Sequence, residues 1–152
     1  MILLDTHILV WLLIAPENLS PKAKKAILAA RKSGPLALSA ISLWEIAWLA
    51  VNKRIDIDVS VDSFVKKCAS YVQVLPITPE IAVRSVQFPK SYPNDPQDRI
   101  IGATAIVEGI RLLTHDKMIV KSGLVPLARS AQENVKLTTS RAGLAYGAVG
   151  VP

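Results

Sequence analysis

Residues 1–14 read MILLDTHILVWLLI, and this opening stretch decides the fold class. The apolar run from Ile2 to Leu4 predicts a short strand that is buried on both faces. Asp5 ends that run, and Thr6 to Leu13 are expected to continue as a short apolar helix. A buried strand that gives way to a helix is typical of an α/β protein, in which helices cover both faces of a parallel sheet.

The same alternation continues along the chain. Further strands are expected at Leu36 to Leu38, Val74 to Ile77 and Arg111 to Thr114, with a candidate edge strand at Val125 to Ala128. Further helices are expected from Ser20 to Lys32, Ser39 to Val51, Val61 to Val72, Thr78 to Val86, Pro96 to Glu108 and Lys117 to Val120. We therefore predict a central, mostly parallel sheet between helices.

Length and composition fit one folded domain. With 152 residues, 51% of them hydrophobic, the chain can bury a single core. The lone cysteine, Cys68, and the absence of a signal-peptide pattern after Met1 lead us to expect a cytoplasmic protein. The longest apolar run, Ile8 to Ala15, is too short to span a bilayer. We expect the folded domain at residues 1–131, and a poorly ordered Gly/Ala-rich tail at residues 132–152.

Charge and hydropathy indicate partners. The net charge of +6 and pI near 9.6 favour a polyanionic substrate, although basicity that merely aids solubility is an alternative. The mean hydropathy of +0.35 is high for a small soluble monomer. We therefore expect part of the apolar surface to be covered by a second copy or by a different protein.

Four acidic residues stand in apolar or neutral surroundings: Asp5, Glu45, Asp98 and Asp116. Asp5 and Asp116 each follow an expected strand, at the sheet edge where ligands bind. Asp98 is the third residue of its helix, and Ser42 lies one turn before Glu45 on the same helix face. Because an unpaired buried carboxylate is costly, we expect the four acids to converge on a divalent cation.

The ligand chemistry predicts which cation. Carboxylate oxygens suit Mg²⁺ or Mn²⁺, whereas zinc would call for the His and Cys residues that are scarce here. Such an ion activates water and stabilises charge on a phosphate, so phosphodiester hydrolysis is the expected chemistry.

Each acid also has a structural alternative. Asp5 could cap the helix that follows it, Asp98 could complete a capping arrangement with Asp95, and Asp116 could start the next helical turn. Glu45 is the hardest to explain structurally, because a solvated glutamate would not be flanked by so many apolar residues.

Four short motifs together carry a family resemblance. They are LLDTH at 3–7, SAISLWEI at 39–46, DPQDR at 95–99 and LTHD at 113–116. In this order and spacing, over about residues 1–130, the chain resembles PIN-domain nucleases, and most of all the VapC-like toxin ribonucleases of bacterial toxin–antitoxin pairs. His7 and His115 stand where many relatives carry other residues.

The resemblance implies a three-layer α/β/α fold and an endoribonuclease that depends on Mg²⁺ or Mn²⁺. It also implies a cognate antitoxin as inhibitor, and commonly a homodimer. Carried over by position, the catalytic and metal-site residues are Asp5, Glu45, Asp98 and Asp116, and Thr6 and Thr114 are supporting polar residues. We expect an antitoxin segment to cover a hydrophobic groove near the acids.

Other residues receive weaker assignments. Lys53, Arg54 and Arg99 are candidates for contacts with substrate phosphates, since they lie close in sequence to the acids. Trp11, Trp44 and Trp48 are expected in the core or in an interface between protomers, rather than as surfaces on which bases stack.

Two competing functions stay open at this level. One is a non-catalytic nucleic-acid-binding or regulatory module with the same fold. The other is a phospho-receiver or small phosphatase, which also places aspartates at strand ends. Receivers need an adjacent acidic pair, and such phosphatases need a second Asp two residues after the first, whereas Asp5 is followed by Thr6 and His7.

Overall fold

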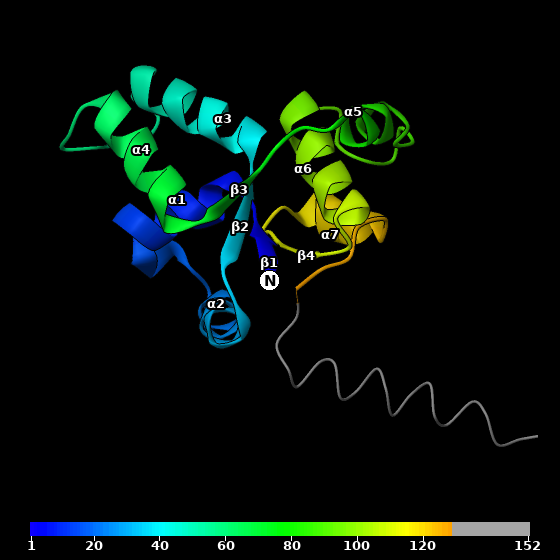
Figure 1. Cartoon of the computed structure of the whole chain (residues 1–152), viewed down its shortest axis with the longest axis horizontal. Coiled ribbons are helices and arrows are strands. Elements are labelled where there is room, and N and C mark those ends of the chain that lie inside the picture. Colours follow the sequence, from blue (N-terminus) through cyan, green and yellow to red (C-terminus); the bar gives the residue numbers. More distant parts are fainter. Residues whose placement is uncertain (129–152) are drawn as a thin grey trace, which may run out of the picture.

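The elements of the computed structural model, which describes residues 1–128, alternate as predicted (Figure 1). The strands are β1 (Ile2–Leu4), β2 (Leu36–Ser39), β3 (Gln73–Leu75) and β4 (Arg111–Leu113). The helices are α1 (Thr6–Ile14), α2 (Pro21–Ser33), α3 (Ala40–Val51), α4 (Val61–Tyr71), α5 (Pro79–Val86), α6 (Pro96–Val107) and α7 (Lys117–Ser122), with a 3₁₀ turn at Pro16–Asn18. The expected tail at 132–152 lies outside the described residues.

All four strands are parallel and lie in the order β3-β2-β1-β4. The first strand of the chain is therefore central: Leu3 lies between Ala37 of β2 and Leu112 of β4. Because the strands are parallel, their carboxyl ends meet at one edge of the sheet. Three of the segments that leave this edge carry Asp5, Glu45 and Asp116.

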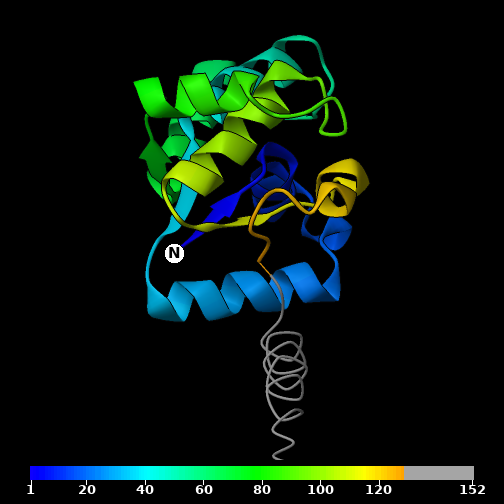
Figure 2. The same ribbon diagram turned by 90° about the vertical axis from the view of Figure 1, so that its right-hand side faces the viewer.

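Helices cover both faces of the sheet. Successive side chains of β1 point to opposite faces. Leu4 contributes to a core cluster shared with α1, α2, α3 and α4, and Leu3 contributes to a second cluster with α5, α6 and α7. Figure 1 shows these two groups of helices on either side of the strands, and Figure 2 shows α2 on the side away from α5 and α6. The predicted three-layer α/β/α fold is confirmed.

Several expected strand boundaries are wrong. β2 runs one residue further than expected, to Ser39, and β4 ends one residue earlier, at Leu113. The third strand begins one residue early and ends at Leu75, because Pro76 has no N–H to donate to the sheet. Val125 to Ala128 form an isolated bridge between Leu112 and Leu127 instead of an edge strand. Pro126 again interrupts the run, and the segment is held by hydrogen bonds on either side of Leu112.

The helix starts follow their expected caps in most cases. Ser20, Ser60 and Thr78 accept hydrogen bonds from the first turns of α2, α4 and α5. Ser39 is an exception, because its side chain makes no capping bond to α3 and instead lies 3.3 Å from Thr104 Oγ1, which donates to it. This bond links β2 to α6. No helix in the described part of the chain is long and apolar enough to cross a membrane.

Candidate acidic site

The four acids leave the same edge of the sheet from different elements. Asp5 follows β1, Asp116 follows β4 by a short loop, Glu45 lies in α3 directly after β2, and Asp98 lies in the first turn of α6. The backbone N–H of Asp5 donates to Leu113 O at 3.0 Å, which ties the ends of β1 and β4 together. The structure thus brings together residues from both ends of the described chain.

The charges of the other acids affect the pKa of Asp98. Burial raises its pKa, and so do the negative charges of Asp5, Asp95, Asp116 and Glu45, to about 7 from an ordinary 3.8. Carboxylates that lie close together repel, and the repulsion favours protonation of one of them. The acids therefore form one electrostatic cluster, in which burial and the neighbouring charges favour the protonated form of Asp98.

Glu45 is half-buried, and a hydroxyl group orients it. Burial raises the pKa of Glu45, whereas a hydrogen bond from Thr6 and the nearby charge of His7 lower it. Thr6 Oγ1 donates to Glu45 Oε2 at 2.5 Å and lies 2.9 Å from Ser42 Oγ. Thr6 and Ser42 are both buried. The two hydroxyls therefore fix the carboxylate of α3 relative to the end of β1.

A second hydroxyl connects Asp5 with Asp116. Thr114 Oγ1 donates to Asp5 Oδ2 at 2.6 Å and accepts from the backbone N–H of Asp116 at 3.0 Å. Asp5 is only 6% exposed, so this bond supports a carboxylate that water scarcely reaches. The side chain of Asp5 does not cap α1.

Asp116 starts a helix, which is the structural role considered for it above, and Asp95 also acts as a helix cap. Asp116 Oδ1 accepts from the backbone N–H groups of Met118 and Ile119, at 2.7 and 2.9 Å, and so caps α7. Asp95 accepts from Gln97 N and caps α6, which leaves Asp98 without a capping role.

The donor chemistry fits a hard divalent cation, since the cluster is made of carboxylate oxygens. None of the four acids forms an ion pair with a basic residue of the described chain. Within residues 1–128, however, no three His, Cys, Asp or Glu side chains are arranged to enclose an ion. The carboxylates lie within range of one another's charge.

The geometry counts against the expected phosphate contact of Arg99. Its guanidinium donates to four acceptors in the loop that precedes α6, namely the carbonyl oxygens of Phe88, Pro89 and Pro93 and Oδ1 of Asn94. Arg99 therefore holds this loop. Lys53 and Arg54 lie beyond the end of α3 with exposed side chains.

Sequence reasoning missed Tyr92, which supports the start of α6. Tyr92 is 1% exposed, stacks on Phe88 with ring centroids 4.0 Å apart, and donates from Oη to the carbonyl oxygen of Asp98 at 3.2 Å. A Cβ atom at position 102 would collide with Tyr92 Oη, so this packing requires Gly102. The available signal was a glycine inside a helical pattern, which often marks a close approach.

Three rings form a further group beside the acids. The ring centroids of Trp11 and His115 are 4.5 Å apart, and His7 lies 6.0 Å from Trp11 and 5.8 Å from His115. Sequence reasoning treated the two histidines and the tryptophan separately and did not place them together.

Fold and site define a class of protein: an α/β/α domain with carboxylates gathered at the carboxyl edge of a parallel sheet. The PIN domain family model matches residues 2–122. The chain belongs to the PIN-domain family.

Particular relatives narrow the comparison. Over 118 residues the chain is 42% identical to Ribonuclease VapC22 of Mycobacterium tuberculosis. This match covers 78% of this chain and 88% of the relative. A chain of a toxin–antitoxin complex from Klebsiella pneumoniae is 26% identical to this chain, with a TM-score of 0.60. The match covers 86% of this chain and 99% of that one. A chain of VapBC2 from Rickettsia felis, solved with a promoter DNA fragment, is 17% identical with a TM-score of 0.64. The match covers 84% of this chain and 97% of that one, and at this identity it shows the fold alone.

Proposed function

We propose that this chain is a divalent-metal-dependent endoribonuclease and the toxin of a VapC-type toxin–antitoxin pair. The observation that carries the proposal is the cluster of acids around Asp98, whose pKa is raised by burial and by its acidic neighbours. The 42% identity to a protein named a ribonuclease supports the choice of RNA. The net charge of +6 is also suited to a polyanionic substrate.

In this proposal Asp5, Glu45, Asp98 and Asp116 hold Mg²⁺ or Mn²⁺. A bound ion of this kind supplies positive charge to the phosphate and makes water more acidic. The hydroxyls of Thr6, Ser42 and Thr114 orient the carboxylates, as side chains behind metal ligands commonly do. Lys53 and Arg54 remain candidates for phosphate contacts farther along the RNA.

The proposal includes a cognate antitoxin as partner, and a homodimer as the assembled form. The Klebsiella pneumoniae relative was solved as a toxin–antitoxin complex. In this chain α3 exposes large apolar side chains that a partner would cover: Trp44 is 54% exposed, Trp48 46% and Val51 67%. Size-exclusion chromatography with light scattering tests the dimer, and a monomer at micromolar concentration would contradict it.

The central test compares two Asp→Asn variants of the purified protein on a defined RNA pool. Wild type is expected to cut RNA with Mg²⁺ or Mn²⁺ and to stop with EDTA. Asp98→Asn is expected to lower the rate at least ~10²-fold, by analogy with loss of one electrostatic stabiliser. Asp62→Asn is the matched control, because the side chain of Asp62 is exposed at the start of α4 and pairs with Lys66.

The outcomes separate the two main functions. Equal rates for Asp98→Asn and wild type would contradict the metal-site mechanism. RNA binding without cleavage at any metal concentration would favour the non-catalytic module instead. Sequencing of RNA ends after brief induction in cells, with wild type and Asp98→Asn side by side, then identifies the RNA that is cut.

A further inference from the structure

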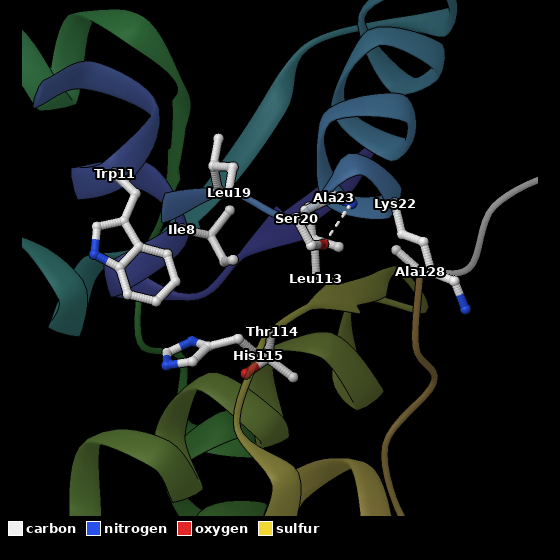
Figure 3. Close-up of a pocket in the computed structure, with 10 residues that line it drawn as sticks. All are labelled: Ile8, Trp11, Leu19, Ser20, Lys22, Ala23, Leu113, Thr114, His115 and Ala128. Atoms are coloured by element: carbon white, nitrogen blue, oxygen red, sulfur yellow. Dashed lines mark hydrogen bonds between the residues drawn. The ribbon is translucent and has the colours of Figure 1, made fainter. Parts of the chain in front are cut away.

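A cavity of about 220 Å³ lies beside the acidic cluster, between α1, the start of α2 and the segment that follows β4. Figure 3 shows Trp11 and His115 on one side of it, Lys22 and Ala128 on the other, and Ile8 and Leu19 between them. The cavity thus has an aromatic wall, an apolar floor and a basic side chain at its rim.

The aromatic wall is accessible. Trp11, which was expected in the core or in an interface, is half-buried and packs on the core, and His115 is exposed. Their rings are tilted by 54° with centroids 4.5 Å apart, and His7 contacts both. Aromatic faces are the surfaces on which proteins stack the bases of single-stranded RNA.

The cavity adjoins the acidic site through Thr114. Thr114 lines the cavity and donates its hydroxyl hydrogen to Asp5, and His115 directly precedes Asp116. A molecule in the cavity therefore lies one side chain away from the carboxylate of Asp5.

Charge also favours a nucleotide as the occupant. The acids repel a phosphate, so a bound strand finds favourable charge on the α2 side of the cavity. Exposed basic side chains lie along α2 at Lys24, Lys25 and Lys32, where they can contact the backbone of a bound strand.

We propose that this cavity binds one unstacked base of the RNA substrate, next to the phosphate that is cut, with Trp11 and His115 as its stacking surface. The inference rests on the proposed ribonuclease function, and it assigns a base-recognition subsite to that activity. The volume of about 220 Å³ can hold a single flat ring, and Ile8 and Leu19 give it an apolar floor.

The test uses a cleavable single-stranded RNA in which each base near the cut is removed in turn. For wild type, one abasic position is expected to lower kcat/KM by about 5- to 150-fold, mainly through KM, as loss of one stacked base does. Trp11→Ala is expected to lower kcat/KM for the intact RNA by a similar factor. In that variant the abasic penalty at this position should vanish, because the two changes remove the same contact.

Three further variants keep the inference testable. Trp11→Phe preserves a stacking face and should retain most of the abasic penalty. Val86→Ala removes a highly exposed apolar side chain on α5, away from the cavity, and should behave as wild type. His115→Ala changes an exposed side chain and should reduce the penalty even if Trp11→Ala fails to fold.

The possible failures are distinguishable. A wild type that cuts no RNA contradicts the proposed function. A wild type that cuts RNA, with the same abasic penalty in folded Trp11→Ala or in His115→Ala, overturns the base subsite and leaves the ribonuclease proposal intact. An abasic scan with no sensitive position overturns the subsite as well.

Discussion

Two threonine hydroxyls hold the carboxylates of the acidic site in place. Thr114 donates to Asp5 and Thr6 donates to Glu45, so each hydroxyl joins the end of one element to a carboxylate carried by another. Bonds of this kind fix the orientation of carboxylates that would otherwise repel one another. At the scale of single residues, the site depends as much on these neutral groups as on its charges.

Replacing Thr6 by valine tests this dependence. The substitution keeps the shape and removes the hydroxyl that donates to Glu45, so the pKa of Glu45 should rise further and cleavage should fall by about 10- to 100-fold. Initial rates at saturating Mg²⁺ provide the measurement. Thr6→Ser keeps the hydroxyl and serves as the control; if it were as slow as Thr6→Val, packing would be the cause.

The pKa of Asp98 predicts a pH dependence for the metal-free protein. Its value is about 7 in the folded chain against an ordinary 3.8. Between these values the folded state binds more protons than the unfolded state, so the free energy of unfolding falls as pH rises through 7. The stabilisation is fully present only below the unfolded value.

Urea unfolding in EDTA, between about pH 5 and 8, measures this slope. Asp98→Asn should flatten the dependence and should be more stable than wild type at the alkaline end. Subtracting the two profiles removes the contributions of the groups that both proteins share. Parallel profiles would show that Asp98 is not strained by its acidic neighbours.

At the scale of elements, the loop before α6 is as important as the helix. Arg99 reaches back from α6 to four loop acceptors, and Tyr92 reaches forward from the loop to the carbonyl oxygen of Asp98. The loop and the first turn of α6 therefore behave as one unit, which sets the position of Asp98.

Arg99→Lys should loosen this unit. Lysine cannot reproduce the planar fork of a guanidinium, so several bonds are lost together and the free energy of unfolding should fall by roughly 1–3 kcal/mol. Hydrogen exchange should rise in residues 88–94. If the variant kept its stability but had a raised KM for RNA, Arg99 would instead contact substrate phosphates, as the sequence led us to expect.

Much of this element pattern could be predicted from the sequence. A buried run followed by an acid defined the ends of the first and last strands, and proline with a cap residue marked the starts of α2, α5 and α6. The role of Arg99 and the pairing of Tyr92 with Gly102 could not be predicted. These contacts depend on how a loop folds back, and local periodicity carries no information about that.

At the scale of the whole molecule, the clustered acids should make stability depend on cations. Any ion that binds only the folded chain raises the free energy of unfolding, by about 2.7 kcal/mol at a concentration of 100 Kd. Thermal melts with increasing Mg²⁺ or Mn²⁺ should show a rising Tm for wild type and Asp62→Asn, and a smaller rise for Asp98→Asn. An unchanged Tm at all concentrations would contradict the metal site.

The place of β1 between β2 and β4 has a consequence for deletions. β4 comes near the end of the described chain, and it pairs with β1 and brings Asp116 to Asp5. A variant truncated before β4 would therefore lose one acid and leave one edge of β1 without a partner. The acidic cluster and the central sheet would be damaged together by the same deletion.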